Sequence, residues 1–260
     1  MKFKQQICYS KDSEEVVYFR VKRKKIDEKY KYTNKNPFYK IFSFIVYRII
    51  ATPIVWFCIK CVKRVKFKNK HLLKQHKKSG YFVYANHTNQ FLDGFAPALL
   101  CFPQKPRIIV NADNVSVPFI GWFTRLAGAL PLPDTLNATK NFNFAINETL
   151  QHTNPIIIYP EAHLWPYYTK IRKFNSSSFR YPAVHNKPVF TFTTTYLAPN
   201  HGKKPKVEIW VDGPFFINPQ LERKAAQEEL KTRVYNTMCE RAKLSDYEYV
   251  NYVKKECNND

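Results

Sequence analysis

The sequence YFVYANHTNQFLD, residues 81–93, joins an apolar run to a polar segment that contains a histidine and an aspartate. The apolar residues 81–84 predict a buried strand, and the run FAPALL at 95–100 predicts the first turns of a helix with Asp93 near its start. This order places His87 in a loop at the carboxyl end of a strand. In open α/β sheets ligands bind at that edge, so this stretch is the candidate site.

His87 and Asp93 form a candidate catalytic pair. A carboxylate can fix the tautomer of a neighbouring imidazole and stabilise the imidazolium that forms when the imidazole deprotonates a hydroxyl. The spacing alone also fits a loop histidine and an aspartate that only caps a helix. The other segments of the chain bear on this choice.

Strand and helix patterns alternate along the rest of the chain, which predicts an α/β fold with a single domain and a mostly parallel sheet flanked by helices. Further strands are expected at residues 107–110, 155–159, 188–193 and 207–211, and helices at 117–126, 141–151, 177–185 and 220–243. Residues 160–174 predict an irregular aromatic loop. The Gly213-Pro214 pair is expected to end the last of these strands. The last helix is expected to bury Leu221, Ala225, Leu230, Val234 and Met238.

Positive charge is concentrated in the first third of the chain. Residues 1–80 hold 22 Lys and Arg against 5 Asp and Glu, and no carboxylate lies between Glu28 and Asp93. Such a segment favours an anionic partner, either nucleic acid or a membrane surface. We find no zinc-finger, RNA-recognition or helix-turn-helix motif in the sequence, so nucleic acid is not the expected partner.

An apolar segment, IFSFIVYRIIATPIVWFCIKCV at residues 41–62, lies inside this basic region and favours a membrane. Pro53 and Arg48 favour a kinked or re-entrant helix pair in the headgroup region, with Tyr47 and Trp56 as interfacial anchors. A buried core helix and a true membrane span are the alternatives. The run begins too late for a signal peptide, so we expect a peripheral or monotopic protein on the cytoplasmic face of the membrane.

The six cysteines are scattered, which predicts reduced thiols rather than a disulfide framework. Cys58 and Cys61 have the spacing of a zinc-ligand pair, but no second Cys or His pair follows at a matching distance. No metal site is expected.

Four successive blocks resemble those of the glycerolipid acyltransferases, the family of 1-acylglycerol-3-phosphate and glycerol-3-phosphate acyltransferases. The first is Asn86-His87 with Asp93, which has one residue more than the family pattern N-H-x-x-x-x-D. The second is PFIGW at 118–122 followed by GALPL at 128–132, the third is YPEAHL at 159–164, and the fourth is KPVFT at 187–191.

The chain departs from the family pattern at the two arginines that contact acceptor phosphate. Asp134 stands near the first of these positions. In the third block Glu161 is kept, while Ala162, His163 and Leu164 replace glycine, threonine and the second arginine. Other basic residues could supply phosphate contacts, although each could equally be a solvated surface residue: Arg125, Lys170, Arg172 and Lys173.

The resemblance implies an acyltransferase domain at residues 80–258, after a basic leader at 1–37 and membrane-contact helices at 38–79. His87 and Asp93 would be catalytic, and the expected substrate-binding residues are Asn86, Glu161, Ala162, His163, Arg125, Lys170 and Arg172. Residues of the aromatic loop would line an acyl groove or contact headgroups, with core packing as the alternative: Leu164, Trp165, Tyr167 and Tyr168.

The implied reaction moves a fatty acyl group from acyl-CoA or acyl-carrier protein, as co-substrate, to the hydroxyl of a lysophospholipid. The expected acceptor is 1-acyl-sn-glycerol-3-phosphate, in phospholipid synthesis at an anionic phospholipid membrane, with no further cofactor. The alternatives are glycerol-3-phosphate, another lysophospholipid or a glycolipid as acceptor, or a catalytically silent lipid-binding homologue.

Overall fold

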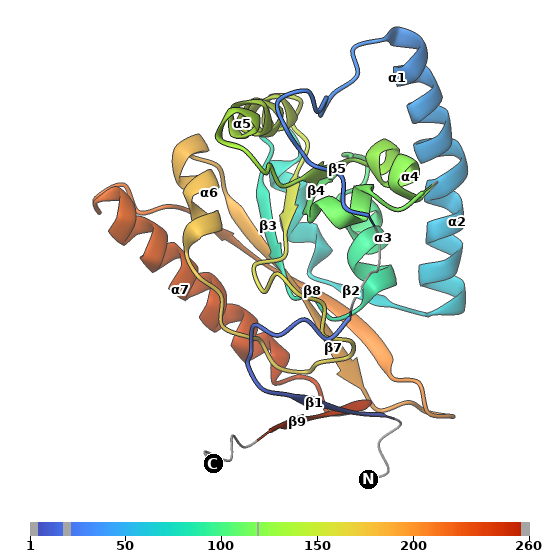
Figure 1. Cartoon of the computed structure of the whole chain (residues 1–260). Coiled ribbons are helices and arrows are strands. Elements are labelled where there is room, and N and C mark those ends of the chain that lie inside the picture. Colours follow the sequence, from blue (N-terminus) through green and yellow to red (C-terminus); the bar gives the residue numbers. More distant parts are fainter. Residues whose placement is uncertain (1–4, 18–21, 119, 256–260) are drawn as a thin grey trace.

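The computed structural model describes residues 5–17, 22–118 and 120–255. Its main element is a seven-stranded sheet with the order β2-β8-β7-β3-β6-β4-β5 (Figure 1). The strands of this sheet are β2 (Lys66–Lys68), β3 (Phe82–Ala85), β4 (Arg107–Val110), β5 (Ala129–Pro131), β6 (Ile156–Ile158), β7 (Val189–Leu197) and β8 (Lys206–Phe215). All neighbouring pairs are parallel except β7 with β8, so the expected mostly parallel α/β sheet is confirmed.

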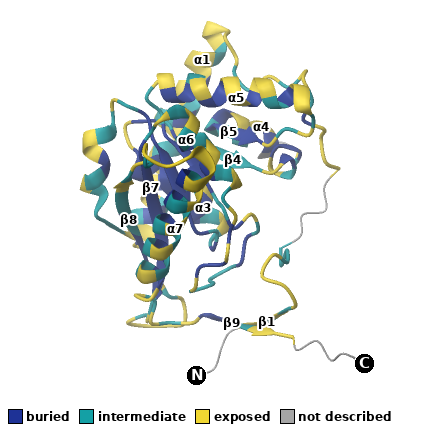
Figure 2. Cartoon of the chain, turned by 90° about the vertical axis from the view of Figure 1, so that its left-hand side faces the viewer, coloured by how far each residue is buried: buried dark blue, intermediate teal, exposed yellow. Residues whose placement is uncertain are grey.

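Successive residues of β3 point to opposite faces of the sheet, and helices cover both faces. Tyr81 and Val83 pack in one core cluster with α3 (Gln90–Leu100) and the helix at residues 37–62. Phe82 and Tyr84 pack in the other with α5 (Leu136–Gln151) and α7 (Arg223–Ala242). Figure 1 shows the sheet between these two helical layers, and Figure 2 shows buried residues along its strands. The shorter helices are η3 (Lys70–His76), η4 (Ala112–Val115), α4 (Ile120–Ala127), η5 (Ser177–Phe179) and α6 (Arg180–His185).

The last strand and the last helix differ from the prediction. β8 continues through Gly213 to Phe215, because the pairing with β7 is irregular at this point and glycine fits beside the Val189 carbonyl at a φ of 119°. α7 begins only at Arg223, so Leu221 precedes the helix and is exposed. The buried seam recurs every four residues at Ala226, Leu230, Val234, Met238 and Ala242, and the exposed Ala225 is not part of it.

The apolar segment is one continuous helix, Pro37–Val62, rather than the expected kinked or re-entrant pair. It comprises α1 (Pro37–Phe44), η1 (Ile45–Ala51), α2 (Thr52–Trp56) and η2 (Phe57–Val62), where η1 and η2 are π-helical. The wider π turn ends beside Pro53: the Thr52 N–H bonds the Tyr47 carbonyl, five residues back. A π turn is one way in which a helix accommodates a disrupted hydrogen-bond ladder.

One narrow face of this helix packs on the domain, through Ser43, Tyr47, Val55 and Ile59. Its other apolar side chains are exposed, among them Phe38, Ile41, Phe44, Ile49, Ile50, Ile54, Trp56, Phe57 and Val62. Within the described residues it is the one helix long and apolar enough to cross a membrane, judged by length and composition.

The basic leader and the end of the chain both fold onto the domain. β1 (Gln5–Tyr9) pairs in parallel with β9 (Val250–Lys254) in a separate two-stranded sheet, near both chain ends in Figure 1. Farther along the leader, Ile26 is fully buried beside Ala112 and Val115.

Two glycines offer a matched test of this packing. A Cβ at the buried Gly121 of α4 would lie 2.4 Å from the Val115 carbonyl oxygen, whereas one at the exposed Gly94 of α3 meets nothing within 4 Å. We expect Gly121→Ala to lower the free energy of unfolding by about 1–3 kcal/mol through overpacking. Gly94→Ala should raise it by about 0.5–1 kcal/mol, since alanine loses less backbone entropy in a helix. Denaturant unfolding followed by circular dichroism measures both, and a Gly121→Ala variant as stable as the parent would contradict the packing of α4.

Candidate active site

The site begins where β3 ends, and Asn86 fixes the direction in which the chain leaves the sheet. Its side-chain amide donates to the Thr194 carbonyl at 3.1 Å, and its side-chain carbonyl accepts the Thr194 N–H at 2.8 Å. These two bonds tie residue 86 to β7 as a further rung of the sheet would. Both polar atoms of the buried Asn86 side chain are thus engaged by backbone, so it is a positioning residue and not the substrate contact that was expected.

His87 and Asp93 are in direct contact. The Nδ1 atom of His87 lies 2.7 Å from the Oδ2 atom of Asp93. Asn89 makes this possible, because it adopts an extended conformation and caps α3 by accepting the Leu92 N–H at 3.1 Å. Asp93 consequently lies in the first turn of the helix, with its carboxylate beside the preceding loop. The cap accommodates the extra residue between histidine and aspartate.

Asp93 is buried and its carboxylate is surrounded by hydrogen-bond donors. Burial raises the pKa of this carboxyl group, and the bonds from His87 and from the N–H groups of Asn89 and Thr88 oppose the shift. The Asn89 N–H lies 2.9 Å from Oδ2. The amino end of a helix also favours negative charge. These donors allow a carboxylate to sit against an imidazole away from water.

Glu161 joins the histidine loop to the third block. Its Oε2 atom accepts the His87 N–H at 3.2 Å, and its Oε1 atom accepts the Arg172 N–H at 2.9 Å. The Arg172 guanidinium lies 3.2 Å from Oε2, and both side chains are buried. Burial raises the pKa of Glu161, while Arg172 opposes that shift. Glu161 therefore reaches the backbone of His87 rather than open solvent.

Arg172 is a structural residue, which corrects the expectation of a phosphate contact. Its guanidinium donates to the His163 carbonyl, donates to the Asp12 carbonyl at 3.3 Å, and packs 4.7 Å above the Trp165 ring. Only Nε lacks a partner within the described residues, and that atom is buried too. Because the Arg172 guanidinium is buried and bonded to protein groups, it cannot bind a substrate phosphate.

Arg125 lies at the opposite edge of the sheet from the histidine. It is exposed on α4, where its guanidinium carbon lies 5.2 Å from the Tyr30 ring, and α4 leads directly into the amino end of β5. His87 follows the carboxyl end of β3, and the strands from β3 to β5 are parallel. The expected role of Arg125 at the dyad is therefore wrong.

The remaining third-block residues surround Glu161. His163 donates its N–H to the Glu161 carbonyl at 2.8 Å and is half-buried. Ala162 is exposed with a φ of 65°, in the left-handed region that glycine adopts at no cost. This explains why the family pattern has glycine at that position. Lys170 is exposed farther along the same loop.

The aromatic loop fixes the backbone of His87 and Thr88 through hydrogen bonds, a role that the sequence did not predict. The backbone N–H of Trp165 donates to the His87 carbonyl at 3.0 Å, and the backbone N–H of Tyr167 donates to the Thr88 carbonyl at 2.8 Å. The Tyr159 ring lies 4.6 Å from the imidazole, and its hydroxyl donates to the Asp93 carbonyl. Trp165 is fully buried against Tyr252, so it packs in the interior and does not line a groove.

The His87 imidazole is partly accessible, whereas the Asp93 carboxylate bonded to it is buried. The His87 side chain is 24% exposed while that of Asp93 is only 6% exposed. No described residue is hydrogen-bonded to the Nε2 atom of His87. A buried acid behind an accessible imidazole is the geometry of a general base that takes a proton from a hydroxyl.

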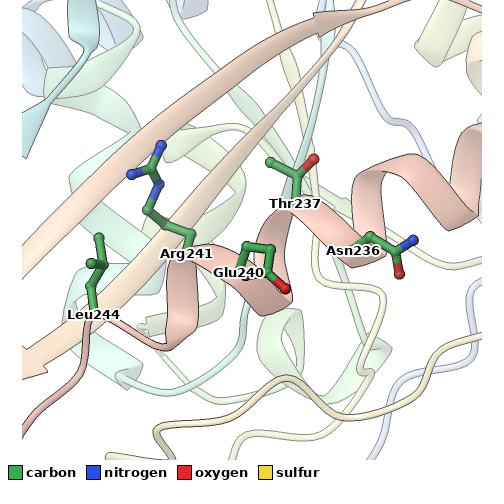
Figure 3. A pocket seen from close by; sticks show the side chains of 5 residues that line it. All are labelled: Asn236, Thr237, Glu240, Arg241 and Leu244. Carbon is green, nitrogen blue, oxygen red and sulfur yellow. The ribbon is translucent and has the colours of Figure 1, made fainter.

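Two surface hollows lie elsewhere. One is lined by four side chains from the carboxyl-terminal half of α7 and by Leu244, two residues beyond its end: Asn236, Thr237, Glu240, Arg241 and Leu244 (Figure 3). The other lies between residues 28–33 and α5. Neither contains the dyad. Among the described residues, no cluster of His, Cys, Asp and Glu could hold a metal ion.

Comparison with known proteins shows the family to which the chain belongs. Residues 64–194 match the model of the acyltransferase family, a span that contains the dyad and Glu161. The fold is similar to the crystal structure of the 1-acyl-sn-glycerophosphate (LPA) acyltransferase PlsC from Thermotoga maritima, with a TM-score of 0.54 and 17% identity over 81% of this chain and 89% of that one. No curated protein sequence matches the chain. The chain belongs to the acyltransferase family, and it is an acyltransferase by enzyme class.

Proposed function

We propose that this acyltransferase moves a fatty acyl group from acyl-CoA or acyl-carrier protein to the hydroxyl of a lysophospholipid. The observation that carries the proposal is the 2.7 Å contact between the accessible His87 imidazole and the buried Asp93 carboxylate. The similar PlsC structure is that of a 1-acyl-sn-glycerophosphate acyltransferase, so 1-acyl-sn-glycerol-3-phosphate is the first acceptor to test.

The reaction uses the two available states of the imidazole. Nε2 of His87 takes the proton of the acceptor hydroxyl as its oxygen attacks the thioester carbonyl carbon. Asp93 stabilises the imidazolium that forms. The carbon–sulfur bond then breaks, and the departing thiolate recovers the proton from the imidazolium. The products are the ester and the free thiol, with no covalent enzyme intermediate.

A second class of acceptor is favoured by the surroundings of Asp134 and Leu164. Asp134 stands near the place of the first family arginine, and it pairs with Arg23 at 2.6 Å and accepts the Ile26 N–H. Leu164, at the place of the second arginine, is buried and apolar. These positions offer no cation to an acceptor phosphate. The lack of a cation at these two positions favours an acceptor without a phosphate, such as a glycolipid, over the other alternative acceptors, glycerol-3-phosphate and another lysophospholipid. A catalytically silent lipid-binding homologue is the alternative outside catalysis.

Membrane association is part of the proposal. The helix Pro37–Val62 presents a wide apolar face with Trp56 exposed on it, and lysines lie at both ends of the segment. Such a helix lies in the membrane interface with its apolar face inserted and its basic residues near anionic headgroups. We propose that the protein docks in this way, as a peripheral or monotopic protein, on the cytoplasmic leaflet.

Removal of the proposed base should abolish transfer. We expect His87→Ala and Asp93→Asn to lower the rate by about 10²–10⁴-fold, the usual contribution of a positioned general base. His201→Ala is the matched control, because His201 is exposed in the loop between β7 and β8. Transfer of labelled acyl groups from acyl-CoA to a panel of lysophospholipids, glycerol-3-phosphate and glycolipids measures this. No transfer by the parent protein to any acceptor would support the silent homologue.

The docking face can be tested apart from catalysis. We expect Ile49→Asn and Ile50→Asn each to weaken binding to phosphatidylglycerol vesicles by about tenfold or more, because each removes an apolar side chain from the interface. Val184→Asn is the control: Val184 is 56% exposed on α6, which packs with α7 on the opposite face of the sheet. Vesicle co-sedimentation measures the affinities. Equal binding by all three variants and the parent would contradict docking through this helix.

A further inference from the structure

Two cationic side chains, Arg48 of the helix Pro37–Val62 and Lys105, lie near the same tyrosine ring, away from the dyad. The Arg48 guanidinium carbon lies 5.5 Å from the Tyr47 ring centroid, and the Lys105 Nζ atom lies 4.6 Å from the same centroid. Lys105 precedes the amino end of β4, whereas His87 follows the carboxyl end of β3. β3 and β4 both pair in parallel with β6, so the two places lie at opposite edges of the sheet.

These cations lack a negative partner. Within the described part of the chain, no carboxylate lies at ion-pair distance from Arg48 or Lys105. The partners of Lys105 Nζ are neutral: Ser43 Oγ at 3.2 Å and the Leu126 carbonyl at 2.8 Å. Burial, followed by repulsion from Arg107 and Arg48, lowers the pKa of Lys105 to about 8. Positive charge is therefore held in a desolvated place at a cost that a bound anion would offset.

Two buried polar atoms at the same place are also unpaired. The Nη1 atom of Arg48 and the Tyr47 hydroxyl are both buried with no hydrogen-bond partner among the described residues. A buried donor without an acceptor costs free energy, and native structures usually supply one. An oxyanion in contact with either group would supply the missing acceptor.

The surroundings indicate where such an anion comes from. Phe44 and Ile45 are neighbours of Arg48 on the helix surface, and both are exposed. The Phe102 ring lies 5.0 Å from the Arg48 guanidinium and is itself 49% exposed. The cations thus lie at the rim of the apolar docking face. When that face inserts into a membrane, the rim reaches the depth of the lipid phosphates.

We infer that Arg48, Lys105 and the Tyr47 hydroxyl bind the phosphate group of a membrane phospholipid, at a headgroup site separate from the catalytic dyad. This inference rests on the proposed docking of the helix Pro37–Val62 to a membrane. The apolar rim selects a lipid phosphate over a free one, since the acyl chains of the lipid would lie against Phe102 and the helix. The site would fix the depth and the rotation of the helix in the interface.

Binding of the full chain to two kinds of vesicle tests the inference. Phosphatidylglycerol vesicles present phosphate, and digalactosyldiacylglycerol vesicles present an apolar interface without it. On phosphatidylglycerol, the fold increase in Kd caused by Arg48→Gln or by Lys105→Gln should be at least ten times the fold increase caused by Lys40→Gln. Lys40→Gln removes the same charge from an exposed position of the same helix, for which about fivefold is expected. On the galactolipid, all of these variants should bind as the parent does.

Arg48→Lys and Lys105→Arg keep the charges and should retain most of the affinity for phosphatidylglycerol. These variants also decide the matter if Lys105→Gln fails to fold after losing its bonds to Ser43 and Leu126, which thermal unfolding reports. Effects of Arg48→Gln no larger than those of Lys40→Gln would overturn the site. Thermal stabilisation by inorganic phosphate that Arg48→Gln removes, with unchanged vesicle binding, would indicate a free-phosphate site and overturn the lipid assignment. Failure of the parent protein to bind either vesicle would refute the docking itself.

Discussion

His87 is restrained by contacts with three other residues, and the proposed chemistry depends on this restraint. Asp93 bonds the imidazole, Glu161 accepts the backbone N–H, and Trp165 donates to the backbone carbonyl. Asp93 comes from the first turn of α3, whereas Glu161 and Trp165 both come from the aromatic loop after β6. A loop histidine with only one of these contacts would lose rotational order, and a general base must be ordered within a few tenths of an ångström of its proton donor.

The spacing of apolar residues predicted those elements that form from residues close together in the chain. The strand at β3, the helix after it and the seam of α7 at Leu230, Val234 and Met238 all follow from the spacing of apolar residues. The pairing of β1 with β9 joins opposite ends of the chain, so no local pattern indicates it. Pro53 suggested a kink, but a π turn within the helix accommodates the proline ring without ending the helix.

The dyad could be predicted because both residues belong to one strand, loop and helix unit. Glu161 is brought to His87 by the pairing of β3 with β6, and the family pattern alone pointed to it. The expected phosphate contact of Arg172 was wrong, because the local sequence of the aromatic loop does not show that this basic residue is buried. Its burial depends on the Asp12 carbonyl, which is distant in the chain, and on the Trp165 ring, whose contact with Arg172 only the folded structure shows. The unpaired charges at Arg48 and Lys105 likewise become visible only once the helix is placed on the domain.

We infer that Asp93 holds the neutral His87 imidazole with its proton on Nδ1, which leaves Nε2 free to accept a proton. Long-range ¹H–¹⁵N NMR of histidine-labelled protein distinguishes the two tautomers at neutral pH. The account predicts a protonated Nδ1 and an unprotonated Nε2 for His87 in the parent protein, and a mixture of tautomers in Asp93→Asn. A proton on Nε2 in the parent, or identical His87 spectra in the parent and Asp93→Asn, would contradict it.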